Sequence, residues 1–180
     1  MCGRYQFNIL DNKIGKQIKE KTRKLNLFYK QGEIFPCDNV LCIIPSESKI
    51  DLVVKKWGIK AKSLLINARM ETIDDRLTYK AIKNNRCAVI CNGFYEWDKN
   101  SIKHYISTRD DYIYLACIFN EANELVIITT NANNQMNKIH NRMPIIMNRD
   151  EMLKYIHNED DIFVEKELII KKCDEFISLF

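Results

Sequence analysis

The fold class is indicated most directly by the stretch Cys87-Ala-Val-Ile-Cys-Asn-Gly-Phe-Tyr-Glu-Trp97. It is mostly apolar and rich in aromatic and β-branched residues, as buried strands are. Further runs of this kind predict more strands, and turn-type residues separate many of them. These runs are Val40–Ile44, Asp51–Ile59, His104–Thr108, Tyr112–Phe119, Leu125–Thr130 and Pro144–Met147.

Helical patterns are fewer than strand patterns. Apolar residues at spacings of three and four predict helices over Ile14–Leu27, Met70–Asn84, Asn133–Ile139 and Arg149–His157. The end of the chain, Glu165–Phe180, fits either a helix or a closing strand. No repeat, low-complexity segment or Gly/Pro/Ser-rich linker interrupts the chain, so we expect one mixed α+β domain over residues 1–180.

Composition restricts the class of protein. The 180 residues are 46% hydrophobic, which is enough to bury one core. The net charge of +4 does not by itself indicate a nucleic-acid partner, and the basic segment Lys13–Lys30 reads as an amphipathic helix with a solvated face. The sequence has no signal-peptide pattern and no apolar run of membrane-spanning length. We therefore expect a cytoplasmic protein with no membrane partner.

The seven cysteines are an odd number, and several lie inside apolar runs. Reduced, buried thiols are the simplest interpretation. There is no C-x-x-C pair, and the three histidines are far from any pair of cysteines in the sequence. We therefore predict no metal site and no cofactor.

Cys2 directly follows the initiator Met1. If Met1 is removed, the chain begins with an amine and a thiol on adjacent carbons, and both have reference pKa values of about 8. Such a terminus can condense its amine with an aldehyde and then close a five-membered thiazolidine ring through sulfur. The alternative is that Cys2 is a small apolar anchor in a first strand.

Two segments carry polar residues in places where chemistry could use them. In Ile66-Asn-Ala-Arg-Met-Glu71, the residues Asn67, Arg69 and Glu71 alternate where a strand would give way to a helix. A polar sheet edge explains them equally well. Glu96 lies between two aromatic residues, where desolvation would raise the pKa of its carboxyl toward the range of a proton-transfer group. A solvent-facing position in an alternating strand is the alternative.

Two later segments complete the set. Thr129-Thr-Asn-Ala-Asn133 ends a predicted strand, and Ile139-His-Asn-Arg-Met-Pro144 follows a predicted short helix. A single histidine such as His140 is often only packed and hydrogen-bonded, so it is a weak signal when taken alone.

Taken together, these segments form a recognisable series. Met1-Cys-Gly-Arg-Tyr5, Trp57-Gly58 and Ile66-Asn-Ala-Arg-x-Glu71 are followed by Asn92-Gly-Phe-Tyr-Glu-Trp97, Thr129-Thr-x-Ala-Asn133 and Ile139-His-x-Arg-Met-Pro144. In this order the chain resembles the SOS response-associated peptidase (SRAP) family, from Met1 through Met147. The resemblance implies an α+β fold, a strand-rich pseudo-barrel with a bifurcated β-sheet and peripheral helices.

The resemblance also implies an activity. A protein of this family senses abasic sites in single-stranded DNA and protects them through a covalent thiazolidine crosslink in the DNA damage (SOS) response. Cys2 would be the nucleophile and Glu96 the general acid and base. His140 would assist opening of the sugar ring and reversal of the link, and Asn67 would hold the terminal amine or the sugar. Lyase and self-processing peptidase activities are further implications.

The same resemblance implies a DNA-binding surface. Arg4, Arg69 and Arg142 would contact phosphates, to which guanidinium geometry is well suited. Trp57, Lys80 and Thr130 would line the DNA path. The protein would be a cytoplasmic, nucleoid-associated monomer whose partner is single-stranded DNA with abasic sites.

The chain departs from the family pattern in two places. After Gly58 it continues as Ile59-Lys-Ala-Lys-Ser-Leu-Leu65, which is shorter than is common in the family and lacks a proline and a second tryptophan. Tyr79-Lys80 stands where members often carry Phe-Arg, so the charge is kept but the bidentate fork is lost. Both departures affect the predicted DNA-facing surface.

Two other classes of function stay open at this stage. Met-Cys-Gly also begins the N-terminal-nucleophile glutamine amidotransferases, in which a terminal cysteine hydrolyses an amide. Here Arg4-Tyr5 follows in place of their apolar, Gly-rich strand. The other class is a non-covalent single-stranded DNA-binding module in which Cys2 is structural.

Overall fold

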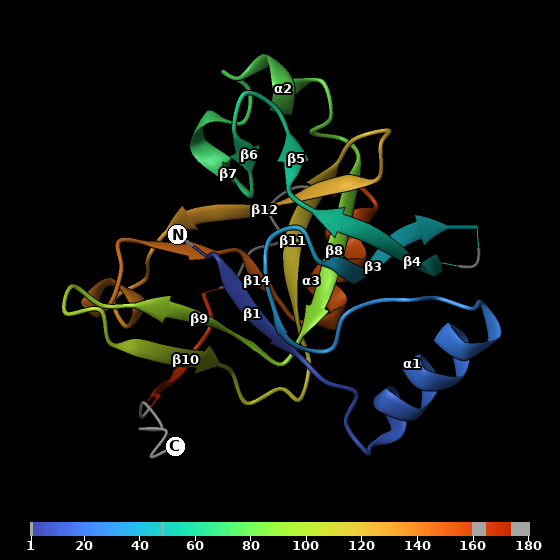
Figure 1. Cartoon of the computed structure of the whole chain (residues 1–180), viewed down its shortest axis with the longest axis horizontal. Helices are drawn as coiled ribbons and strands as arrows, with labels where there is room; N and C mark the ends of the chain where they lie inside the picture. The colour runs from blue at the N-terminus through green and yellow to red at the C-terminus, as the bar shows by residue number, and fades with distance from the viewer. Residues whose placement is uncertain (1, 48, 160–164, 174–180) are drawn as a thin grey trace, which may run out of the picture.

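The computed structural model describes residues 2–47, 49–159 and 165–173. It is a strand-rich α+β structure in which one sheet closes into an uneven ring, and the helices lie at its periphery (Figure 1). The predicted fold class is therefore confirmed.

The ring sheet consists of long strands that pair in a closed circuit. They are β3 (Asn39–Ser46), β4 (Lys49–Trp57), β8 (Arg86–Cys91), β11 (Ile113–Phe119) and β12 (Glu124–Asn131). The order is β12-β4-β3-β8-β11, and β11 pairs again with β12. The β4–β12 pairing is parallel, and the others in this circuit are antiparallel. The apolar run Cys87–Cys91 lies in β8 at 0–2% exposure, as a strand covered on both faces requires.

The sheet bifurcates at β12. Its first residues pair with β4 on one side and with β11 on the other. Its last residues pair instead with β7 (Asn67–Arg69) and with β13 (Arg142–Pro144). The end of β12 therefore brings together segments that are about 70 residues apart in sequence, and the candidate site is built there.

A second sheet carries the beginning of the chain. Its order is β15 (Ile169–Lys172), β10 (Lys103–Ser107), β9 (Gly93–Trp97), β1 (Arg4–Phe7) and β2 (Gly32–Ile34), with every neighbouring pair antiparallel. Buried side chains on its inner face include Tyr5, Phe94 and Ile106. β1 thus enters the structure directly beside the strand that contains Glu96.

The strand predicted over Cys87–Trp97 is in fact two strands. It divides at Asn92, whose backbone N–H donates to the carbonyl of Gln6 at 2.8 Å. Its side chain accepts from Asn8 and donates to Asp111. These bonds hold a corner, so β8 stays in the ring sheet while β9 joins the second sheet. The C-terminal segment contains a strand, β15, up to Lys172, and residues 174–180 lie outside the described part.

Two of the four predicted helices are confirmed. α1 (Lys13–Lys24) begins at Asn12, whose side chain accepts from the backbone N–H of Gly15 at 2.7 Å. α3 (Arg149–Ile156) begins with a capping box formed by Asn148 and Glu151. No helix in the described ranges is long and apolar enough to cross a membrane.

The helix predicted over Met70–Asn84 is wrong in extent. It is replaced by a 3-10 turn, η1 (Met70–Thr72), and a single helical turn, α2 (Leu77–Lys80). Its apolar stripe is covered only in part, since Ile73 is buried but Met70 and Leu77 are 41% and 85% exposed, and a helix depends on packing of its apolar face. Similarly, Asn133–Ile139 contains only the 3-10 turn η2 (Met136–Lys138). Three short strands complete the elements, β5 (Ile59–Lys60), β6 (Leu64–Leu65) and β14 (Ile146–Met147).

Candidate active site and nucleic-acid interface

Cys2 is buried just before β1. Burial is the main cause that raises the pKa of its thiol to about 12, and the negative charge of Glu96 raises it further, while the backbone N–H of Arg4 acts in the opposite direction. The thiol therefore carries its proton at neutral pH. Met1 lies outside the described residues, so the predicted removal of Met1 stays a prediction.

Asn67 binds the backbone of Cys2. Its Nδ2 donates to the Cys2 carbonyl at 2.9 Å. The strand that carries Asn67 is fixed from the interior, because Trp57 Nε1 donates to Ile66 O at 2.9 Å and Tyr79 Oη donates to Asn67 O at 3.0 Å. Asn67 Oδ1 is buried and accepts no hydrogen bond from any residue that the structure describes. It is thus an acceptor available to a group bound beside Cys2.

Glu96 is on the inner face of β9. Phe94 on this face is buried and pairs in register with Tyr5 of β1, and Glu96, two residues further along, is only 5% exposed. The solvent-facing alternative considered from the sequence is therefore wrong. A carboxylate beside a protonated thiol can accept the thiol proton when sulfur attacks.

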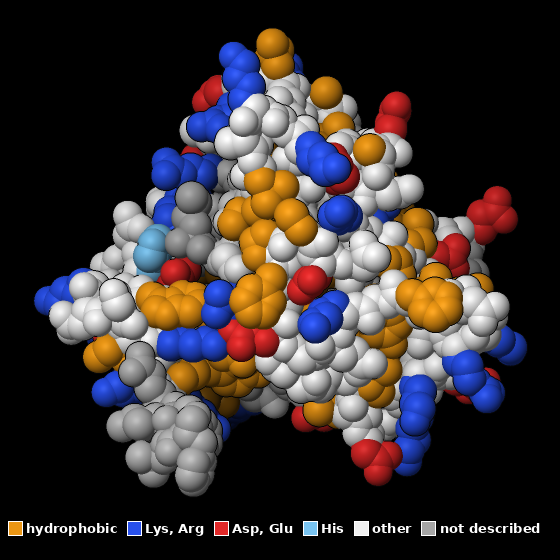
Figure 2. Space-filling view, viewed as in Figure 1, with side chains coloured by type: hydrophobic (Ala, Val, Ile, Leu, Met, Phe, Trp, Pro, Cys, Tyr) orange, Lys and Arg blue, Asp and Glu red, His pale blue; other side chains and the backbone are white. Residues whose placement is uncertain are grey.

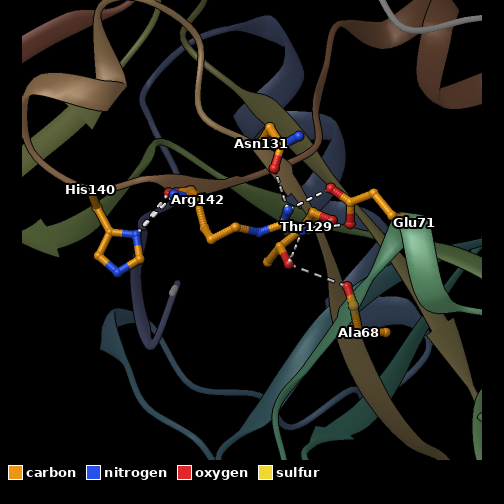
Figure 3. A network of polar contacts seen from close by, with 6 residues as sticks. All are labelled: Ala68, Glu71, Thr129, Asn131, His140 and Arg142. Carbon is orange, nitrogen blue, oxygen red and sulfur yellow. Dashed lines mark hydrogen bonds and ion pairs between the residues drawn. The ribbon is translucent and has the colours of Figure 1, made fainter.

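His140 is oriented by the backbone of Arg142. The N–H of Arg142 donates to His140 Nδ1 at 3.0 Å (Figure 3). The same Nδ1 lies 3.3 Å from the carbonyl oxygen of Arg142, so the backbone of this one residue holds the Nδ1 edge of the ring in either tautomer.

The side chain of Arg142 is the centre of a polar network (Figure 3). It forms a bidentate ion pair with Glu71, with Nη1–Oε1 at 2.5 Å and Nη2–Oε2 at 2.9 Å. It also donates to Asn131 Oδ1, to the carbonyl of Thr129 and to Thr129 Oγ1. Its hydrogen bonds lower the pKa of the Glu71 carboxyl.

Burial of Arg142 corrects one prediction. The residue is 7% exposed, and its guanidinium is already bound by carboxylate, amide, hydroxyl and carbonyl oxygens. A DNA phosphate would have to displace Glu71 to reach it. We therefore take Arg142 out of the expected phosphate contacts and treat it as a structural anchor.

Trp57 is corrected for the same reason. Its side chain is fully buried, and its ring centroid lies 5.4 Å from that of Tyr5. A ring enclosed in the core cannot stack on a base. Its structural contribution is the hydrogen bond to Ile66, next to Asn67.

Three other predicted DNA-binding residues are accessible. Arg69 ends β7 and Lys80 ends α2, and both side chains are exposed. Thr130 is half-buried and lines a surface hollow of about 420 Å³ together with Met70 and Asn131. Arg69 and Thr130 lie at the end of β12, and Lys80 follows Tyr79, which binds the backbone of Asn67 in β7.

Arg4 lies on the outer face of the second sheet. Its guanidinium carbon is 4.2 Å from the ring centre of Phe35 and 5.0 Å from that of Trp97, and Nη1 pairs with Glu33 at 3.2 Å. Lys103 pairs with the same carboxylate at 2.6 Å. Figure 2 shows basic and hydrophobic side chains alternating over this region of β1, β9 and β10. Arg4 is therefore partly neutralised, although about a third of its side chain is exposed.

Several residues of the site were not identified as functional from the sequence. Thr129 and Asn131 bind Arg142, and Tyr79 binds the backbone of Asn67. Thr129 and Asn131 lie inside a quoted segment, but nothing in the sequence relates them to an arginine 11 to 13 residues later. Within the described ranges, no cluster of three or more His, Cys, Asp or Glu side chains could hold a metal ion.

Asn67 thus binds the backbone of Cys2, and the charge of Glu96 acts on the Cys2 thiol. The segment that begins at Asn67 continues to Glu71, which binds the Arg142 that orients His140. A family model described as SOS response associated peptidase (SRAP) matches residues 1–177. The chain belongs to the SRAP family.

Three abasic site processing proteins have sequences similar to this chain. The abasic site processing protein YoqW of Bacillus subtilis is 27% identical over 193 residues, covering 93% of this chain and 86% of YoqW. The abasic site processing protein YoaM of the same organism is 26% identical, covering 87% of this chain and 79% of YoaM. A vertebrate relative, the abasic site processing protein HMCES of Xenopus tropicalis, is 26% identical over 57% of this SRAP chain and 44% of its own.

Solved structures agree with the fold. A protein from Bordetella bronchiseptica superposes with a TM-score of 0.76 at 16% identity, covering 96% of this chain and all of that one. A protein from Bacteroides thetaiotaomicron also gives 0.76, at 19% identity, with coverage of 97% and 93%. At these identities the likeness concerns the SRAP fold alone.

Proposed function

We propose that this SRAP-family protein processes abasic sites in single-stranded DNA by forming a thiazolidine crosslink through Cys2 once Met1 has been removed. The observation that carries the proposal is the surroundings of Cys2. The thiol is buried, the charge of Glu96 acts on it, and Asn67 binds the Cys2 carbonyl. The segment of Asn67 also contains Glu71, which binds the Arg142 that orients His140. The names of the relatives, abasic site processing proteins, give the same substrate class.

The proposed reaction joins two functional groups of Cys2 to one aldehyde carbon. The α-amine adds to the C1′ aldehyde of the ring-opened deoxyribose and loses water, which gives an imine. The thiol sulfur then adds to the imine carbon while its proton goes to nitrogen. One C–N and one C–S bond form, one water leaves, and nothing is oxidised or reduced.

The site residues match these steps. Because the raised pKa keeps the thiol protonated at neutral pH, a base would take its proton as sulfur attacks, and we assign this role to Glu96, whose charge acts on the thiol. His140 would assist opening of the sugar ring, in which the C1′ hydroxyl loses a proton and the ring oxygen gains one. Asn67 Oδ1 can accept from the α-amine or a sugar hydroxyl, while Nδ2 holds the Cys2 carbonyl.

The proposed DNA path runs over the accessible basic and polar residues near the end of β12. Arg69 and Lys80 would bind phosphates, and Thr130 would contact the strand beside the lesion. Arg4 would contribute only through the part of its guanidinium that Glu33 leaves accessible. In this proposal the protein acts as a monomer in the cytoplasm, associated with the nucleoid. Lyase and self-processing activities would be secondary to the crosslinking of abasic sites.

The test is direct. A chain shown by mass spectrometry to begin at Cys2 is incubated with a single-stranded oligonucleotide carrying one abasic site and analysed on a denaturing gel. We expect a covalent species that resists heat and detergent. Cys2→Ser should give at most a labile imine product, and a chain that retains an N-terminal extension should give none, because its amine is then an amide.

The other two classes of function give different results. Hydrolysis of glutamine by the processed chain without any DNA adduct would indicate an amidotransferase-like enzyme. DNA binding that is equal in wild type and Cys2→Ala, with no covalent product, would indicate a non-covalent binding module.

A further inference from the structure

A short segment of the chain contacts both halves of the candidate site. At one end of Asn67–Glu71, Asn67 Nδ2 holds the Cys2 carbonyl. At the other end, both oxygens of Glu71 bind the guanidinium of Arg142. Only three residues separate the two ends, and the first three residues of the segment are fixed in β7 against β12.

Arg142 transmits this constraint to His140. Its side chain is anchored by Glu71, Asn131 and Thr129, as Figure 3 shows, and its backbone N–H is the donor that His140 Nδ1 accepts. Its register is fixed too, because Arg142 pairs with Asn131 in the β12–β13 ladder. A residue held at both its side chain and its main chain has little freedom to shift the ring bound to it.

We infer that Glu71 is a positioning residue for His140, acting through Arg142. In this arrangement Asn67–Glu71 sets the place of the nucleophile relative to the place and tautomer of the histidine. The inference rests on the proposed function for the role of His140. It assigns to the Glu71–Arg142 pair a task in the reaction and no contact with DNA.

The substitution that tests this is Glu71→Gln, which keeps the shape of the side chain but removes its charge. The matched control is Glu151→Gln. Glu151 also belongs to an ion pair, with Lys166 at 2.6 Å, but it lies in α3, where it caps the helix. If Glu71→Gln fails to fold, Asn131→Ala replaces it, because Asn131 is exposed and supplies one acceptor to Arg142.

The first readout compares two aldehydes. An abasic oligonucleotide needs its sugar ring opened, whereas propanal does not. Glu71→Gln should slow adduct formation with the abasic oligonucleotide about tenfold, the order expected when a catalytic group is misplaced by a fraction of an ångström, and should leave the propanal reaction within about twofold. Added to His140→Ala, it should cause no further loss, since residues that act as one unit are not additive.

The second readout is nitrogen-15 NMR of the imidazole side chains in wild type, Glu71→Gln and Glu151→Gln. In wild type, the His140 signals should report one dominant tautomer, because the backbone of Arg142 holds the Nδ1 edge of the ring. Glu71→Gln should mix the tautomers of His140, while Glu151→Gln should leave them unchanged.

Three results would overturn the inference: unchanged His140 signals in Glu71→Gln, equal slowing with both aldehydes, or an additive loss in the double variant. If the wild-type chain forms no adduct with the abasic oligonucleotide, it is the proposed function that fails. The NMR comparison still decides whether Glu71 positions His140.

Discussion

The side-chain amide of Asn67 donates a hydrogen bond to the backbone carbonyl of Cys2 across 65 positions of the sequence. The bond fixes the backbone of Cys2, just before β1. Asn67 lies in β7 of the ring sheet, whereas β1 belongs to the second sheet, so a residue of one sheet holds the start of the other. Because Trp57 and Tyr79 in turn hold the backbone on either side of Asn67, this contact is supported by the core.

Removal of this contact should affect both the reaction and the fold. Asn67→Asp keeps the shape but cannot donate from an ionised carboxylate to a carbonyl, and we expect crosslinking to slow about tenfold with a loss of stability of about 1–3 kcal/mol. Single-turnover crosslinking and urea denaturation measure the two effects. Asn92→Ala, which removes side-chain hydrogen bonds at a distant corner, is the control. A normal crosslinking rate in Asn67→Asp would remove Asn67 from the site.

The thiol of Cys2 should react slowly with alkylating reagents. With a pKa of about 12, about one molecule in 10⁴ is a thiolate at pH 8. Because the Glu96 carboxylate contributes to the raised pKa, Glu96→Gln should lower it and speed iodoacetamide labelling of Cys2 severalfold. The exposed Cys37 provides an internal reference in the same peptide map. Slower or equal labelling of Cys2 in Glu96→Gln would contradict this electrostatic coupling.

The Glu71–Arg142 pair should make folding stability depend on acidity. The hydrogen bonds of Arg142 lower the pKa of Glu71 in the folded chain, so the pair stabilises fully above the unfolded value of about 4.3, and this stabilisation is lost as the pH falls through the lower folded value. Glu71→Gln should therefore flatten the stability curve below about pH 4. Since 41% of the Glu71 side chain is exposed, solvent screening limits the difference to less than about 1 kcal/mol. Urea denaturation of both proteins over acidic pH measures it, and parallel curves would contradict the prediction.

The long strands could be predicted from the sequence because their apolar residues are buried on both faces or alternate. The runs from Val40, Tyr112 and Leu125 correspond to β3, β11 and β12. Short strands such as β2 and β7 have too few residues to show a period. They exist because a longer neighbour supplies their hydrogen bonds, and this is information that the local sequence does not contain.

For the candidate site, too, some features could be predicted from the sequence and others depend on distant neighbours. The residues that meet around Cys2 were identified from their types and order, but the orientation of Arg142 and the burial of Trp57 were not. A guanidinium or an indole suits DNA contact equally well before its neighbours are known. Glu71 packs against Arg142 and Tyr5 against Trp57, and these neighbours determine whether each side chain is accessible to DNA. Both neighbours come from distant segments of the sequence.

Trp57 should therefore contribute to stability and not to DNA binding. Trp57→Ala leaves a cavity in the core and an unpaired Ile66 carbonyl, and we expect a loss of about 3–5 kcal/mol. The milder Trp57→Phe should stay folded and keep the salt dependence of single-strand binding. Denaturation and binding titrations on both variants separate the two roles. Normal stability with weakened DNA binding would restore Trp57 to the DNA path.

Arg69 and Arg142 should differ in their effects on DNA binding, although both are arginines in segments that suggested phosphate contacts. Arg69 is exposed, so Arg69→Ala should lower the slope of log K against log salt by about 0.7, the value for one phosphate contact on a single strand, and Lys80→Ala should do the same. Arg142→Ala should leave the slope unchanged and reduce stability by about 2–3 kcal/mol, because the half-exposed Glu71 loses its partner and buried acceptors lose their donor. Fluorescence anisotropy over a range of salt, with denaturation of the same samples, gives both quantities, and Lys24→Ala on the exposed face of α1 is the control for a basic residue away from the path. A reduced slope with intact stability in Arg142→Ala would return Arg142 to the phosphate contacts and leave the buried network of Figure 3 without its assigned role.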